Sequence, residues 1–335
     1  MRCQESFRSI RRFRHPSFSP ATQRKRKPVT HNAKALRGVV PIIPTPFHAG
    51  SEEVNSAAIG PLIDFAIESG AAGVCLPAYA SEFYKLTEAE RAGLVEAAVS
   101  HAAGRIPVLA QSNHPSAKAA CAIARANARL GADIISFAIP RIFALGNDDL
   151  LRYCAAICDA VDLPVLIQDF NPGGPTIGAD FCRRLADACP NFQYVKLEEA
   201  LMGAKVTAIR EATDDRVGVL EGWGGLYMLE LYPYGLCGIM PGLGVADLLV
   251  HIWRRAEAGD SGGAMDIFEK VCPQLMFSLQ NMEMFLHVEK RLLVQRGVLA
   301  DATVRQATLS PSPQLLAFGD FLNSRVIQAA RSLAA

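Results

Sequence analysis

Eight short apolar runs, each followed by a helical pattern, constrain the fold of this 335-residue chain more than any other feature. They consist mainly of Val, Ile, Leu and Cys, as expected for parallel strands that are covered on both faces. The runs span residues 39–45, 73–78, 107–112, 134–139, 164–169, 192–197, 217–222 and 237–242. Eight strand–helix units in this order predict an α/β fold, a (β/α)8 barrel (TIM barrel), which typically needs about 250 residues.

Three segments follow from this pattern. Residues 38–260 form the predicted catalytic barrel, and residues 1–37 form a basic leader that we expect to be disordered. Residues 261–335 are mostly helical in pattern, with a break at 310–313, and form a predicted C-terminal helical extension. A doubly wound open sheet is the alternative for the barrel, but no Gly-x-Gly-x-x-Gly follows the first run.

The net charge of +1 conceals an uneven distribution. Residues 1–37 carry 11 Lys and Arg but one acidic residue, so the rest of the chain is acidic overall. The leader fits a disordered tail, a transit-type targeting peptide or a nucleic-acid arm. Because the acidic body offers no basic surface to extend such an arm, we expect no nucleic-acid partner. No apolar stretch of a secretory signal follows the charges, and no run of about 18 apolar residues predicts a membrane span.

The cysteines and histidines argue against disulfides and metals. The nine cysteines are scattered, mostly in apolar runs and without a Cys-x-x-Cys pair, which is typical of buried thiols in a reducing compartment such as the cytoplasm. None of the seven histidines forms an HExxH-like pair, and only His48 and His114 fall at the predicted active face. We therefore predict no metal.

Lys196 is the best candidate nucleophile. It ends the sixth apolar run, and strand alternation places Glu198 on the same face, about 7 Å away along the strand. An apolar environment disfavours the ammonium form, and a free amine can attack a keto group to form a Schiff base. The nearby carboxylate could then move protons. A structural salt bridge between the two residues is the alternative.

Other candidates are chosen because they follow the carboxyl ends of predicted strands, where barrel enzymes place their active sites. They are Thr45, His48, Tyr79, Ser81, Glu82, Ser112, His114, Arg141, Gln168, Asp169, Glu221, Trp223, Pro241 and Gly242. The glycine-rich stretches at Gly222 and Gly242 could offer amides to a phosphate or make room for a substrate. Neither has a Lys or Arg beside it, so the phosphate is the less favoured ligand.

Four motifs in order resemble those of the dihydrodipicolinate synthase/N-acetylneuraminate lyase family of class I aldolases. They are Pro44-Thr45-Pro46-Phe47, a Glu-bearing loop after the second run, Leu163-Pro164-Val165, and Val195-Lys196-Leu197-Glu198-Glu199. The resemblance extends from about Gly38 to Leu299. It implies a homotetrameric barrel, a dimer of dimers, in which Lys196 forms a Schiff base with a 2-oxo acid and no separate cofactor is needed.

The departures from the synthase pattern carry further information. The synthase loop Gly-Thr-Thr-Gly-Glu is replaced by residues 78–82, which are Ala-Tyr-Ala-Ser-Glu. The two working tyrosines of the synthases fall at Gln168 and near His114, and the substrate-binding arginine falls near Arg141 or Ile142. Dihydrodipicolinate synthesis is therefore not expected. The replacements are similar to the 2-keto-3-deoxy-L-arabinonate dehydratase branch. That branch has a Ser-Glu loop after the second strand, a Ser/Thr-rich turn that ends in His after the third, a Gln-Asp pair on the fifth and a Lys-x-Glu on the sixth.

The resemblance implies a role for each residue of the site. Lys196 forms the imine, and Glu198 or Tyr79 moves the critical proton. The predicted substrate-binding residues are those expected to surround Lys196, namely Ala80, Ser81, Glu82, His114, Gln168, Asp169, Gly222 and Gly242. The expected reaction is dehydration of 2-keto-3-deoxy-L-arabinonate to 2-oxoglutarate semialdehyde. A pyruvate-releasing aldolase and a non-catalytic barrel that binds small acids remain as alternatives.

Overall fold

A computed structural model describes residues 36–171, 174–306 and 308–334 of the chain. The predicted leader lies outside the described residues except for its last two positions. Each of the eight apolar runs contains a strand. The strands are β1 (Gly38–Val39), β2 (Val74–Leu76), β3 (Val108–Gln111), β4 (Ile134–Ala138), β5 (Val165–Phe170), β6 (Phe192–Glu198), β7 (Gly218–Glu221) and β8 (Gly238–Ile239).

The strands form one parallel sheet that closes on itself. Its order is β1-β8-β7-β6-β5-β4-β3-β2, with every neighbouring pair parallel. A parallel bridge between Ile42 and Cys75 joins the segment after β1 to β2. The Ile43 amide donates to the Cys75 carbonyl at 3.0 Å across this junction. The predicted barrel is confirmed.

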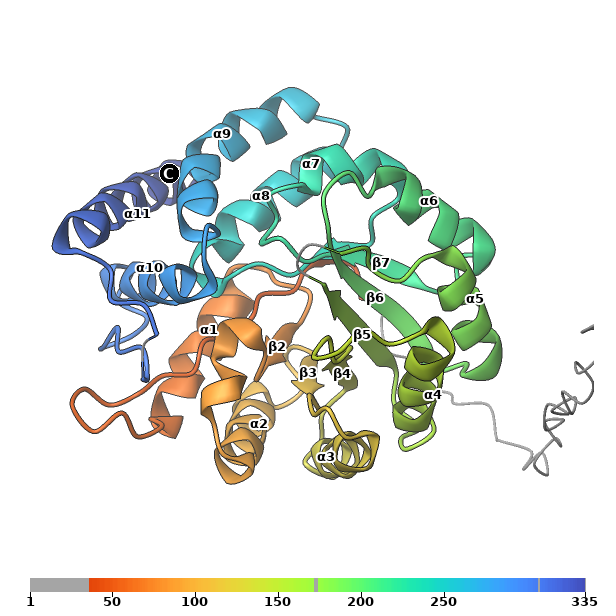
Figure 1. Ribbon diagram of the computed structural model, residues 1–335. Helices are drawn as coiled ribbons and strands as arrows, with labels where there is room; N and C mark the ends of the chain where they lie inside the picture. The colour runs from red at the N-terminus through yellow and green to blue at the C-terminus, as the bar shows by residue number, and fades with distance from the viewer. Residues whose placement is uncertain (1–35, 172–173, 307, 335) are drawn as a thin grey trace, which may run out of the picture. The chain divides into compact units, whose positions relative to one another are not determined.

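Eight helices follow the strands and lie outside the sheet (Figure 1). They are α1 (Ile59–Glu68), α2 (Glu88–Ala102), α3 (Ala117–Arg129), α4 (Asn147–Cys158), α5 (Ala179–Ala188), α6 (Gly203–Ala212), α7 (Met228–Leu231) and α8 (Ala246–Glu257). Helix α2 begins as its sequence predicts, because the Thr87 hydroxyl accepts from the Glu90 amide and the Glu90 carboxylate accepts from the Thr87 amide.

The predicted C-terminal extension consists of three helices, α9 (Ser261–Ser278), α10 (Met282–Gln295) and α11 (Pro313–Ala334). They pack against one another beside α8 (Figure 1). The break between α10 and α11 runs from 296 to 312 and is longer than the sequence pattern indicates. None of the described helices is long and apolar enough to cross a membrane.

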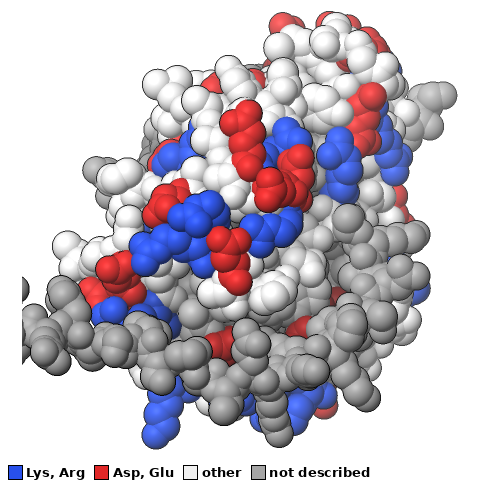
Figure 2. Space-filling model, turned by 90° about the vertical axis from the view of Figure 1, so that its right-hand side faces the viewer, with Lys and Arg blue, Asp and Glu red and all other residues white. Residues whose placement is uncertain are grey.

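Charges of both signs are intermixed on the face that Figure 2 shows. Exposed ion pairs of α5 join charges of opposite sign, since Arg183 pairs with Asp180 at 2.8 Å and Arg184 pairs with Asp148 of α4 at 2.8 Å. Such exposed pairs contribute little to stability. The charged side chains that can be seen in this view therefore form no patch of a single sign.

Candidate active site

The barrel interior is built in two layers by strand alternation. The lower layer is apolar and includes Leu109 of β3, Leu166 of β5 and Tyr194 of β6. Two residues further along the same strands, the inward positions become polar, with Gln111, Gln168 and Lys196. In the register of the sheet Gln168 lies beside Lys196. The polar layer therefore rests on a water-excluding floor at the carboxyl ends of the strands.

Lys196 and Glu198 lie together as their spacing predicts. The Lys196 Nζ is 3.0 Å from Glu198 Oε1, and both side chains are more than nine-tenths buried. Gln168 Nε2 donates to the same Glu198 oxygen. Within the described part of the chain, Glu198 Oε2 has no hydrogen-bond partner. An amine and a carboxylate with one free oxygen thus face the same cavity.

A row of amide side chains fixes the orientation of Gln168. Its Oε1 accepts from Gln111 Nε2 at 3.1 Å, so its Nε2 is directed at Glu198. Gln111 Oε1 in turn accepts from Asn113 Nδ2, and Asn113 Oδ1 accepts from the Ala138 amide. Every member of this buried row therefore has a partner, as buried polar groups require. Gln168 lines the cavity, but it serves first to hold the Glu198 carboxylate.

Gly222 provides the space for the lysine and the carboxylate. A Cβ at this position would lie 2.8 Å from Lys196 Cε and 2.9 Å from Glu198 Oε1, and closer still to Glu198 Cγ. Real Cβ atoms do not approach other atoms this closely. The glycine at this strand end is thus required for room, which was one of the two roles that its sequence context allowed.

Tyr79 and Ala80 form the wall opposite β6. They open a short 3₁₀ helix, η2 (Tyr79–Ser81), whose first amides have no acceptor within the helix. The Tyr79 ring packs edge-on against Phe83 and Phe170. Burial raises the pKa of the Tyr79 hydroxyl, and the nearby Glu198 charge raises it further. Tyr79 is therefore a proton donor rather than a base in this cavity.

Ser81 has a structural role instead of the predicted substrate contact. Its hydroxyl donates to the Ile43 carbonyl at 2.6 Å and accepts from the Ala78 amide at 2.9 Å. The Ser81 amide donates to the Ala78 carbonyl, and its carbonyl accepts from the Thr45 hydroxyl. Because its polar groups are all engaged within the protein, Ser81 shapes the 78–82 loop and leaves the ligand contacts to its neighbours.

Glu82 also points away from the cavity, which corrects its predicted place among the substrate-binding residues. The residue is fully buried and adopts a left-handed backbone with φ of 60°. Its carboxylate contacts Lys290 Nζ of α10 at 2.5 Å, Lys85 Nζ at 3.1 Å and the Arg305 amide at 3.2 Å. Glu82 thus ties the 78–82 loop to the C-terminal extension.

Asp169 faces outward because it follows the inward-facing Gln168. Arg141 binds it with Nε at 2.9 Å and Nη2 at 2.6 Å, and the Ile177 amide donates to it at 2.7 Å. The predicted contact between Asp169 and substrate is therefore corrected. Arg141, which the family resemblance offered as a carboxylate-binding residue, is instead engaged by this buried partner.

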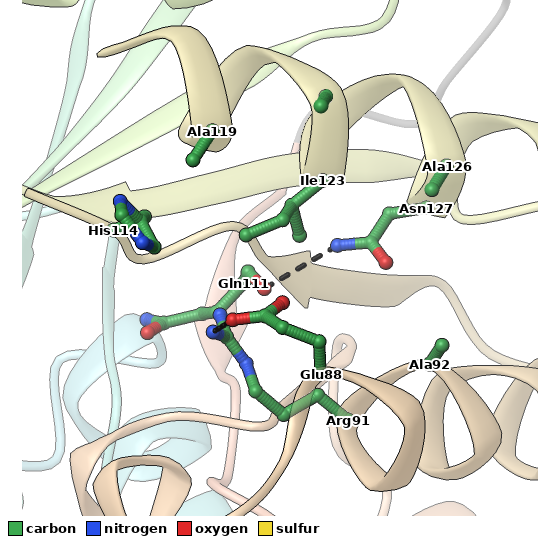
Figure 3. Close-up of a pocket in the computed structure, with 10 residues that line it drawn as sticks. Glu88, Arg91, Ala92, Gln111, His114, Ala119, Ile123, Ala126 and Asn127 are labelled. Carbon is green, nitrogen blue, oxygen red and sulfur yellow. Dashed lines mark hydrogen bonds and ion pairs between the residues drawn. The ribbon is translucent and has the colours of Figure 1, made fainter. Parts of the chain in front are cut away.

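His114 lies outside the cavity at Lys196. It lines a separate pocket between α2 and α3, beside Ile123 and the ion pair of Arg91 with Glu88 (Figure 3). Its Nδ1 accepts from the Ser116 amide at 2.9 Å. The residue before it, Asn113, turns into the polar layer in its place. Of this predicted loop, the structure therefore brings Asn113 rather than His114 to the polar layer beside Lys196.

Two buried carboxylates outside the predicted catalytic and substrate-binding residues hold the loops beyond β7 and β8. Glu221 accepts from the Gly225 amide at 2.7 Å and from the Tyr227 amide at 3.4 Å. Glu289 of α10 accepts from the Gly244 amide at 2.6 Å. Burial raises the pKa of each carboxyl to about 7. The sequence identifies Glu221 as a candidate because it ends a predicted strand. It gives no such signal for Glu289, which lies in an ordinary helical pattern.

A pH-dependent stability difference follows from Glu289. Its pKa in the folded protein exceeds the value of 4.5 expected when unfolded, so its contribution to stability is present below pH 4.5 and is lost as pH rises through about 7. This rise in pKa corresponds to about 3 kcal/mol. In denaturant titrations between pH 4.5 and 8, wild type should lose about that much more stability than Glu289→Gln. Parallel stability curves would contradict the assignment.

The cavity at Lys196 brings together most of the predicted site. Its lining includes Tyr79, Ala80, Gln168, Lys196, Glu198, Gly222 and Gly242. It also includes three residues from α10 and the turn before it, Leu279, Met282 and Phe285, which sequence reasoning assigned to no site. Within the described ranges, no cluster of three or more His, Cys, Asp and Glu side chains is placed to hold a metal.

Comparison with known proteins gives a consistent result. A model of the dihydrodipicolinate synthetase family matches residues 35–314. An L-2-keto-3-deoxyarabonate dehydratase from Azospirillum brasilense is 26% identical over 283 residues, covering 83% of this chain and 89% of its own length. A 4-hydroxy-tetrahydrodipicolinate synthase from Thermomicrobium roseum is 28% identical, with 69% and 73% covered. A dihydrodipicolinate synthase structure from Rhodopseudomonas palustris has a TM-score of 0.80 at 25% identity, with 86% and 97% covered.

Proposed function

Because the chain belongs to the dihydrodipicolinate synthetase family and is therefore a lyase-type enzyme, we propose that it dehydrates a 2-keto-3-deoxy sugar acid through a Schiff base on Lys196. The observation that carries the proposal is the buried pair of Lys196 and Glu198, 3.0 Å apart over an apolar floor. The proposed substrate is 2-keto-3-deoxy-L-arabinonate, and the proposed product is 2-oxoglutarate semialdehyde.

The first step is imine formation. Glu198 takes a proton from the Lys196 ammonium, and the free amine attacks the C2 keto carbon of the substrate. The keto oxygen leaves as water with one proton from the amine and the proton that Glu198 had taken, so Glu198 is again a carboxylate. Tyr79 and Ala80 line the cavity, and we propose that their first-turn amides hold the substrate carboxylate. No other cofactor is needed, because the protonated imine itself acts as the electron sink.

The second step is elimination. The iminium acidifies C3, and Glu198 removes a C3 proton through its free Oε2. The C4 hydroxyl then departs as water, with a proton from Glu198 or Tyr79. Loss of a C5 proton and protonation at C3 give an enol that becomes the terminal aldehyde. Hydrolysis of the imine releases the product and restores Lys196, so the net change is the loss of one water.

Two other functions remain testable against this one. A class I aldolase would use the same imine to cleave C3–C4 and release pyruvate, but it needs a base at the C4 hydroxyl. The family tyrosine on β5 is replaced by Gln168, whose carboxamide is held by Gln111 and Glu198. A non-catalytic barrel that binds small acids would have no use for the Lys196–Glu198 pair.

Assembly and compartment are proposed on separate grounds. We propose a homotetramer, a dimer of dimers, by analogy with the family. Seven cysteines of the described residues are free thiols, which favours a reducing compartment such as the cytoplasm; they are Cys75, Cys121, Cys154, Cys158, Cys182, Cys237 and Cys272. No nucleic-acid or membrane partner is part of the proposal.

The test of the reaction is proton NMR of the purified enzyme with 2-keto-3-deoxy-L-arabinonate. We expect signals of 2-oxoglutarate semialdehyde to appear as the substrate signals decline. Pyruvate and glycolaldehyde in their place would assign the aldolase reaction. An unchanged substrate would contradict the pentonate assignment, and borohydride reduction in the presence of pyruvate would then show whether an imine forms at all.

A further inference from the structure

The cavity at Lys196 is roofed by apolar side chains of the C-terminal extension. Leu279, Met282 and Phe285 line it from the start of α10 and the turn before it. Phe285 lies over Gly242, where an added Cβ would come within 2.9 Å of the ring. Leu279 lies over Gly224, where a Cβ would come within 3.2 Å. We call these three side chains the roof. They pack against the glycines of the β7 and β8 loops and line the cavity from the side of the C-terminal extension.

The same part of the cavity lacks a partner for a second negative charge. Among its lining residues, which all lie in the described part of the chain, only Lys196 and Glu198 are charged. The protonated imine at Lys196 keeps one positive charge, which is balanced by the Glu198 carboxylate beside it. Two cations of the extension are engaged elsewhere, since Lys290 is buried against Glu82 and Arg305 binds Glu90. A carboxylate placed under the roof would thus be buried without a counter-ion, which is strongly unfavourable.

We propose that this roof is a specificity element that restricts the enzyme to 2-oxo acids whose far end is uncharged. Met282 is the part of the roof best suited to substitution, because it lines the cavity and is only half-buried. The inference rests on the proposed function, since it requires the imine at Lys196. In this proposal the C-terminal extension selects the end of the substrate that lies far from its keto group, whereas the reacting residues belong to the barrel.

The proposal is tested by letting two 2-oxo acids of equal length compete with pyruvate for imine formation at Lys196. Wild-type protein is reduced with borohydride in the presence of isotopically labelled pyruvate, and the Lys196 adduct is measured by mass spectrometry. Unlabelled 2-oxopentanoate and 2-oxoglutarate are added as competitors. We expect 2-oxopentanoate to compete at a concentration about 100-fold lower, because only 2-oxoglutarate buries an unpaired carboxylate.

A matched pair of variants locates the effect. Met282→Arg supplies a counter-ion at the roof and should reduce the 2-oxopentanoate preference at least about 10-fold. Met276→Arg, on the exposed face of α9, should leave it unchanged. Equal competition by the two acids in wild type would overturn the roof proposal while the pyruvate adduct upheld the imine. Absence of any pyruvate adduct would instead overturn the proposed function, on which the roof proposal depends.

Discussion

Replacing Lys196 with Ala is expected to lower turnover on the order of 10⁶-fold, the loss that follows removal of a covalent nucleophile. Lys196 is the lysine that lines the cavity among the described residues, and its Nζ lies 3.0 Å from Glu198. Without its amine the substrate keto group has no imine partner, and C3 is not acidified. The variant should also fail to form a borohydride-stable adduct with pyruvate, which mass spectrometry of the intact protein measures directly.

The chain offers a closely matched control for this experiment. Lys205 also pairs with a glutamate, Glu199, but it lies on α6 outside the cavity. Lys205→Ala should therefore retain both turnover and the pyruvate adduct. Circular dichroism of both variants would show that each is folded. An adduct that persists in Lys196→Ala would place the imine on another lysine and would remove the basis of the proposed mechanism.

The barrel could be predicted from the sequence because its strands are buried on both faces. Continuous apolar runs are a strong signal when each strand is covered by helices outside and by a packed interior. The same alternation placed Lys196 and Glu198 together, since residues two apart on a strand share a face. Applied consistently, it would also have excluded Asp169, which directly follows the inward Gln168 and binds Arg141 outside the barrel.

Other parts of the site depend on tertiary contacts that no local pattern encodes. The sequence does not show that Glu82 meets Lys290, because the two are 208 positions apart. Likewise, Met282 and Phe285 fit the apolar stripe of an ordinary helix, and their place over the cavity follows only from how α10 packs. The same strand alternation accounts for His114. Asn113 lies two residues after the inward Gln111 and joins the polar layer, so His114 is directed elsewhere.

Replacing Glu198 with Gln is expected to lower turnover about 10²- to 10⁴-fold, the usual contribution of a positioned acid–base group. The amide keeps the size of the side chain, and its oxygen can still accept from Gln168 Nε2. It cannot remove the C3 proton. The amide also cannot take the Lys196 proton, so the pyruvate adduct should form more slowly than in wild type, with water as the base. Product formation, followed by NMR, should fall further than adduct formation, because it also needs the C3 proton transfer.

Glu199→Gln is the matched control, because the neighbouring carboxylate pairs with Lys205 and Thr176 away from the cavity. It should turn over substrate as wild type does. If Glu198→Gln were also close to wild type, Glu198 would serve only to pair with Lys196, and the critical proton would have to pass through Tyr79. Tyr79→Phe would then show the larger loss. Because burial and the Glu198 charge both raise the pKa of Tyr79, we expect the opposite order, with the carboxylate as the main base.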